Sequence, residues 1–192
     1  MSENIGRNKR GGGFEQPYFD GGEPTFVRQE IEDAYPHAVQ IDEVIREIID
    51  SLEKDITERG LEFSFDFPEH IVAFPGNRDT VHTILDEVIC NSVKYNKLHG
   101  KIQIQITQQD DICRVVVSDT GVGFGEEIKD DVFKRFYRAP SSVQLHSRGA
   151  GLGLHMAQEL IGAHGGSISL ISEEGKGTKA TLIFNMYGSA TS

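Results

Sequence analysis

The chain has 192 residues, of which 38% are hydrophobic and 26% are charged, a composition that suits one compact domain with some length to spare. Its 19 Lys and Arg residues against 30 Asp and Glu residues give a formal net charge of -11, which disfavours general binding to nucleic acid. Any phosphate that the protein binds must therefore be held locally, by backbone amides, a metal ion or a few well-placed cations.

Cysteine content and hydropathy indicate a cytoplasmic chain without direct membrane contact. Cys90 and Cys113 are too few for a disulfide framework, and both lie in apolar periodic segments where a buried free thiol is expected. No apolar run approaches the roughly 20 residues needed to cross a bilayer, and the N-terminus lacks the apolar stretch of a signal peptide.

The N-terminal third of the chain is predicted to hold a flexible leader, one helix and two strands. Residues 1–36 combine glycine runs and prolines with scattered charge, which is typical of a linker. Apolar residues at helical spacing then predict a single amphipathic helix from about Asp42 to Gly60. Residues 61–67 alternate as in a half-buried strand, and residues 71–74 have the pattern of a short second strand.

The remaining pattern predicts helices and hairpins in alternation. A long helix is expected over residues 78–95, a hairpin over 102–119, a third helix from about 154 to 165, and a closing hairpin over 168–186. Strands joined mostly by hairpins, with three main helices between them, predict an α/β two-layer sandwich with the helices on one face of a mixed sheet. We assign this domain to residues 37–187 and a short tail to 188–192.

The second predicted helix carries a polar face next to its apolar stripe. Glu87, Asn91, Lys94 and Tyr95 lie at i, i+4, i+7 and i+8 and therefore share that face. An amide and a carboxylate one turn apart can hold a hydrated Mg²⁺ or orient a water. Lysine offers a point charge to phosphate, and tyrosine offers a flat ring to a base. The alternative is an ordinary solvated face.

Two glycine-rich segments follow. Asp119 ends an apolar strand and begins the sequence DTGVGFG, so its carboxylate can accept a hydrogen bond from the amino group of adenine, although a simple turn has the same composition. Residues 148–154, with the sequence RGAGLGL, enter the third helix, whose first N–H groups and dipole attract anions. Neither a P-loop nor a dinucleotide-binding pattern is present.

Taken together and in this order, these segments resemble the ATP-binding domain shared by sensor histidine kinases, type II topoisomerases, the Hsp90 chaperones and MutL, which is called the Bergerat or GHKL fold. Residues 87–95 look like the N box, 119–123 the G1 box and 149–153 the G2 box. Residues 132–139, VFKRFYRA, are similar to the F box found in histidine kinases and not in the other branches. The resemblance covers roughly residues 38–186.

The resemblance implies a site for ATP and Mg²⁺. By this resemblance, Asn91 is expected to bind the metal, and Lys94 and Tyr95 to contact phosphate and adenine. Asp119 is expected to recognise adenine N6, with a water held by Thr178. By the same resemblance, Gly121 and Gly123 shape the adenine pocket, and the phosphate loop is supplied by Gly149, Gly151 and Gly153, together with Leu152. Arg138 and Arg148 either reach the phosphates or are solvated loop cations.

Three segments carry further expectations. Glu87 stands where many histidine kinases have Asn, so it either acts as a general base or completes the outer shell of the metal. Residues 138–148 correspond to a mobile ATP lid. Phe133 and Phe136 either anchor that lid or dock a partner helix, with core packing as the simpler expectation.

The implied activity is transfer of the ATP γ-phosphoryl group to a histidine on a separate dimerisation and phosphoacceptor domain, for relay to the receiver domain of a response regulator. The acceptor must come from outside, because none of the 7 histidines begins the acceptor pattern on a predicted helix. Two other functions remain open: an ATPase or nucleotide-gated switch, which Glu87 favours, and a non-catalytic nucleotide-binding module.

Overall fold

The computed structural model describes residues 38–69, 74–139 and 150–185. The predicted leader 1–36, most of the predicted lid, the tail and residues 71–73 of the predicted second strand lie outside these ranges, as do the site candidates Arg148 and Gly149. In the described residues no helix is both long enough and apolar enough to cross a membrane.

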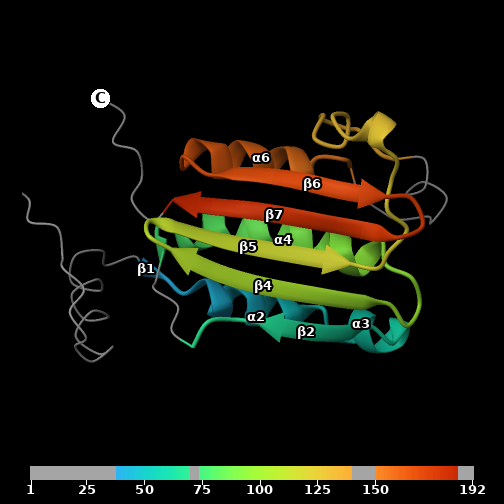
Figure 1. Ribbon diagram of the computed structural model, residues 1–192, viewed down its shortest axis with the longest axis horizontal. Coiled ribbons are helices and arrows are strands. Elements are labelled where there is room, and N and C mark those ends of the chain that lie inside the picture. Colours follow the sequence, from blue (N-terminus) through green and yellow to red (C-terminus); the bar gives the residue numbers. More distant parts are fainter. Residues whose placement is uncertain (1–37, 70–73, 140–149, 186–192) are drawn as a thin grey trace, which may run out of the picture.

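A five-stranded mixed sheet forms one layer of the domain (Figure 1). Its order is β2 (Glu62–Asp66), β4 (Lys101–Gln109), β5 (Ile112–Asp119), β7 (Gly177–Asn185) and β6 (Ser167–Glu173). β2 runs parallel to β4, and the other neighbours are antiparallel. A separate antiparallel pair joins β1 (Ala38–Val39) to β3 (Phe74–Pro75).

Three helices cover one face of this sheet, as predicted: α2 (Ile41–Ser51), α4 (Arg78–Lys94) and α6 (Gly153–Ala163) (Figure 1). α4 lies between the other two and contacts both. The core is made by the apolar stripes of the helices and by alternate strand residues such as Ile102, Ile104 and Ile106. The two-layer sandwich therefore follows directly from the two hydrophobic periods in the sequence.

The single helix predicted from Asp42 to Gly60 is wrong, because the chain forms two helices there. α2 ends at Ser51, and Leu52 adopts φ -98° and ψ 4° before α3 (Glu53–Arg59) begins. Four residues of α2 are buried against the core, whereas no residue of α3 is. Ile56 of α3 still packs partly on the core. The helical spacing of apolar residues therefore continues from α2 into α3 and gives no sign of the break between them.

α4 begins with a capping hydrogen bond that should stabilise the domain. The Asn77 side chain accepts a hydrogen bond of 3.0 Å from the Thr80 amide. Because alanine leaves that N–H without its partner, Asn77→Ala should lower the free energy of unfolding by about 1 kcal/mol in urea titrations. Asn77→Asp keeps the acceptor and should restore most of the loss. Equal stability of all three proteins would contradict the assignment.

Candidate functional site

A cavity of about 440 Å³ opens between α4, the adjoining ends of β5 and β7, and the start of α6. Its volume lies within the range of about 300–1,000 Å³ typical of small-molecule sites. Most of the predicted site residues line it: Glu87, Asn91, Lys94, Tyr95, Asp119, Gly123, Arg138, Gly151, Leu152, Gly153 and Thr178. Residues from 87–95, 119–123, 138–153 and 178, which are far apart in the sequence, are thus brought to one cavity.

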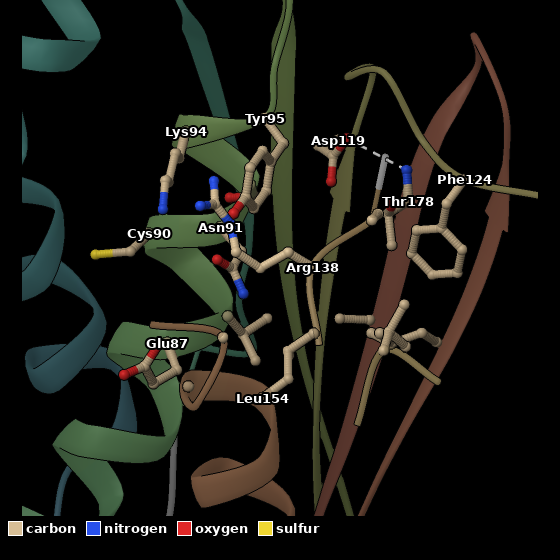
Figure 2. Close-up of a pocket in the computed structure, with 18 of the residues that line it drawn as sticks. Glu87, Cys90, Asn91, Lys94, Tyr95, Asp119, Phe124, Arg138, Leu154 and Thr178 are labelled. Atoms are coloured by element: carbon tan, nitrogen blue, oxygen red, sulfur yellow. Dashed lines mark hydrogen bonds between the residues drawn. The ribbon is translucent and has the colours of Figure 1, made fainter. Parts of the chain in front are cut away.

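The C-terminal half of α4 supplies the polar wall of the cavity. In Figure 2, Asn91 and Tyr95 project from α4 toward Arg138 and the strand that carries Asp119. The Lys94 ammonium lies 5.1 Å from the centroid of the Tyr95 ring, which is within cation–π range. The prediction that the polar residues of this helix border a cleft is therefore confirmed.

Asp119 stands at the end of β5 with one carboxylate oxygen already bonded. Its Oδ1 accepts a hydrogen bond of 2.7 Å from the Gly121 amide. It also accepts one of 3.2 Å from the Thr178 amide (Figure 2). Within the described chain no donor is bonded to Oδ2, so that oxygen can accept from a ligand. Burial raises the pKa of the Asp119 carboxyl, and the two amide N–H bonds oppose that rise.

Gly123 and Gly121 stand at positions near the site where a side chain would collide with neighbouring backbone. Gly123 has φ +58°, and a Cβ there would lie 2.1 Å from the Glu173 carbonyl oxygen. Gly121, in contrast, does not line the cavity. Gly121 is buried, and a Cβ there would lie 2.5 Å from the Tyr95 carbonyl oxygen. The predicted role of Gly121 in shaping the pocket is therefore indirect, through the backbone that it lets approach.

Glu87 lies against the N-terminus of α6. A Cβ on Gly153, the first residue of that helix, would lie 1.8 Å from Glu87 Oε2. Burial raises the pKa of the Glu87 carboxyl, the neighbouring Asp86 carboxylate raises it further, and Lys94 lowers it. A carboxyl with this shift is a better proton acceptor than an ordinary glutamate, and the helix N-terminus beside it attracts anions.

Glu87 and Asn91 fit the first requirement for Mg²⁺, because they bring two side chains with oxygen atoms into one cavity at one-turn spacing. The described residues contain no group of three or more His, Cys, Asp or Glu able to hold a metal by themselves. A magnesium ion here would therefore need oxygens from a phosphate ligand and water, which is how this ion is commonly held.

Cys90 and Phe136 differ from their predicted environments. Cys90 is only half-buried and lines the cavity, its thiol donates to Asp86 Oδ1 at 3.3 Å, and burial raises its pKa to about 12. It is therefore a protonated thiol and not a nucleophile. Phe133 packs partly on the core as expected, but Phe136 is 70% exposed, so core packing is wrong for that residue.

The sequence interpretation missed most of the apolar wall of the cavity. That wall includes Val117, Phe124, Leu154, Met156, Leu170 and Ala180. The strand residues among them share the period-2 pattern of ordinary core positions, so no sequence signal separates cavity wall from core. The polar contacts of Ser172 were also missed. Its hydroxyl lies 2.9 Å from the Thr178 hydroxyl and 2.9 Å from the Phe124 amide nitrogen.

More than half of the chain matches a known protein family. Residues 76–187 match the family model described as histidine kinase-, DNA gyrase B-, and HSP90-like ATPase. The chain is 33% identical over 146 residues to sensor histidine kinase WalK of Bacillus subtilis, covering 75% of this chain and 24% of that protein. The matched region spans between 24% and 42% of the length of WalK and two other curated relatives.

Solved structures show the same fold. The catalytic domain of histidine kinase ThkA superposes with a TM-score of 0.66 at 25% identity, over 76% of this chain and 91% of that domain. A structure of ThkA in complex with the response regulator protein TrrA gives a TM-score of 0.66 at 20% identity, over 86% of this chain and 48% of that one.

Proposed function

Since the chain belongs to the family of histidine kinase-, DNA gyrase B- and HSP90-like ATPases, we propose that it is the ATP-binding catalytic domain of a sensor histidine kinase. The activity is transfer of the γ-phosphoryl group of ATP to a histidine of a separate dimerisation and phosphoacceptor domain. ATP is present in the cytoplasm, so we infer that the domain works there.

The cavity supports this proposal by its division into two chemically different ends. At one end lies the Asp119 carboxylate oxygen that accepts no hydrogen bond from the described residues, among apolar side chains, a setting that suits a flat heterocycle with one amino group. At the other end Asn91, Lys94 and Arg138 offer polar and cationic groups to phosphates. This pairing of an acceptor-lined apolar end with a cationic end is the observation that carries the assignment.

We further propose that Asn91, with Glu87 in the inner or outer shell, holds Mg²⁺ together with the ATP phosphates. Bound there, Mg²⁺ supplies charge neutralisation for the transferred group. Lys94 and the start of α6 at Gly153 stabilise the phosphate oxygens, and Asp119 orients the nucleotide from its base. These residues act by positioning and electrostatics, which is the main protein contribution to phosphoryl transfer.

The partners proposed for this domain are the phosphoacceptor domain and the receiver domain of a response regulator. The existence of a ThkA complex with a response regulator protein supports the second of these as a partner class. Incubation of the full chain with γ-labelled ATP, Mg²⁺ and candidate acceptor domains tests the proposal. We expect acid-labile label on the acceptor, as phosphohistidine requires. Tight ATP binding without labelling of any acceptor histidine would refute it.

A second candidate function is ATP hydrolysis, favoured by the raised pKa of Glu87 and its position beside the N-terminus of α6. In this alternative the Glu87 carboxylate takes a proton from a water that attacks the γ-phosphorus, the bond from that phosphorus to the β–γ bridging oxygen breaks, and ADP and phosphate are released. Under the kinase proposal, where Glu87 supports the metal, Glu87→Gln should slow acceptor labelling by about tenfold. Measured phosphate release without acceptor, reduced to background by the same substitution, would favour the hydrolase instead.

A further inference from the structure

We propose that Arg59 is a positioning residue for the nucleotide site, acting through the C-terminal end of α4. This inference rests on the proposed function. Arg59 is the last residue of α3, and it lies outside residues 76–187, which match the family model. Figure 1 places α3 at the same end of the sheet as the C-terminus of β5, where Asp119 stands.

Arg59 bonds directly to the last turn of α4. Its Nη1 donates to the Lys94 carbonyl oxygen at 2.8 Å, and its Nη2 donates to the Asn96 carbonyl oxygen. In the other direction, the His99 amide donates to the Arg59 carbonyl oxygen at 2.9 Å. Gly60 makes this approach possible, because its φ is +61° and a Cβ there would lie 2.6 Å from His99 Nδ1.

These contacts meet a specific need of α4. The last carbonyl groups of a helix have no partner within it, and a cation near them is favoured by the helix dipole. The guanidinium is a planar fork with several fixed donors, so it can bond two carbonyls that diverge at a helix end. One of those carbonyls belongs to Lys94, and Tyr95 follows as the C-cap; both side chains line the cavity.

The end of α4 is in turn bonded to the loop after Asp119. Asn96 is 2% exposed, its Oδ1 accepts from the Thr120 hydroxyl at 3.3 Å, and its Nδ2 donates to the Lys101 carbonyl oxygen at 3.3 Å. The Val122 amide donates to the Tyr95 carbonyl oxygen at 3.0 Å. A displacement of the α4 end would therefore move the phosphate-binding side chains and the Asp119 loop relative to one another.

Arg59 thus connects a helix upstream of the matched family region to both ends of the cavity. A residue that only stabilised the fold would behave differently on substitution. It would lower the midpoint of unfolding but leave the nucleotide affinity of the folded molecules unchanged. A positioning residue changes the affinity at temperatures where every variant is fully folded, because small shifts of bound groups weaken the ligand contacts.

The test uses three variants of the full chain. Arg59→Met keeps the aliphatic stem and removes the donors, whereas Arg59→Lys keeps the charge with a single ammonium group. Arg46→Met is the matched control, because the Arg46 guanidinium lies 5.6 Å from the centroid of Phe67 and does not line the cavity. Calorimetry with Mg²⁺ and a non-hydrolysable ATP analogue, well below each unfolding midpoint, gives the dissociation constants.

We expect Arg59→Met to raise the dissociation constant about tenfold, Arg59→Lys to raise it by less, and Arg46→Met to leave it within about twofold. Amide hydrogen exchange supplies a second measurement that needs no ligand. In Arg59→Met the Val122 amide should exchange faster, while the Phe136 amide, bonded to the Gly151 carbonyl oxygen at 2.8 Å, should not change.

The outcomes separate this inference from the proposed function. Unchanged affinity in folded Arg59→Met would overturn the positioning role, whatever the rate of Val122 exchange. If Arg59→Met does not fold, Arg59→Lys takes its place, and wild-type affinity in that variant would overturn the role. If the unsubstituted chain binds no nucleotide, the proposed function fails. Faster Val122 exchange in Arg59→Met would even then support the inference that Arg59 stabilises the loop after Asp119.

Discussion

Asparagine in place of Asp119 is expected to weaken adenine nucleotide binding by about 100-fold without destabilising the domain. The Asn carbonyl oxygen can take over the hydrogen bonds from the Gly121 and Thr178 amides. The amide NH2 then stands where Oδ2 was, so a donor meets the donor on adenine. Hydrogen bonds to charged groups contribute about 1.5–3 kcal/mol, and each 1.4 kcal/mol is about tenfold in affinity.

Although Asp119→Asn should weaken nucleotide binding, it should leave the stability of the folded chain the same or increase it. Burial raises the pKa of the Asp119 carboxyl above its ordinary value of 3.8, so ionisation is less favourable in the folded chain than in the unfolded one. The resulting cost to stability is present above the folded-state pKa and is relieved as the pH falls through it. The neutral amide removes this cost, so Asp119→Asn should unfold at the same or a higher temperature at neutral pH.

The same carboxyl should make nucleotide binding depend on pH. As the pH falls through the raised pKa of Asp119, its carboxyl becomes protonated and loses an acceptor site, so affinity of the unsubstituted chain should fall. Asp119→Asn should lack this particular decrease. Calorimetry over a pH series measures both, with Asp111→Asn in the exposed β4–β5 turn as the matched control. Unchanged affinity in Asp119→Asn at neutral pH would disprove the adenine assignment.

Local periodicity was sufficient to predict most of the fold. The stripe of α4 and the alternation in β4 and β5 are long, regular signals, and the structure has those elements close to the predicted bounds. The break at Leu52 was not predicted, because the apolar spacing of α2 continues into α3 with no glycine or proline between them. Exposure of Phe136 was not predictable either, since it depends on tertiary packing.

The sequence predicted those parts of the candidate site in which a polar side chain or a helix N-terminus stands next to several glycines. Asp119 followed by glycines and the glycine-rich entry to α6 stand out from ordinary loops, and the structure brings both to the cavity. The apolar wall did not stand out, because a side chain that lines a cavity has the same sequence pattern as one in the core. Arg59 could not be found at all, since its contacts join residues 35 and 37 positions away in the chain.

Alanine in place of Asn91 is expected to reduce Mg²⁺-dependent phosphoryl transfer on the order of a thousandfold, a larger effect than that of Asp119→Asn on nucleotide binding. Asn91 and Glu87 stand one turn apart on α4 and line the same cavity. The described residues offer no cluster of three carboxylate, histidine or cysteine ligands that could hold the ion without them. Removal of the amide oxygen therefore leaves Glu87, the nucleotide phosphates and water to hold it.

The substitution should separate two contributions to affinity. In the presence of EDTA, nucleotide binding by Asn91→Ala should stay within about threefold of the unsubstituted chain, because the proposed contacts of Asp119 and Tyr95 with the base do not involve Asn91 or the metal. The increase in affinity on adding Mg²⁺ should disappear. Asn77→Ala is the control, since it loses a helix cap on the same helix, about 1 kcal/mol of stability, but no group in the cavity. If Asn91→Ala kept a normal magnesium response, the metal would have to be held elsewhere, and the division of the cavity into a base end and a magnesium–phosphate end would be wrong.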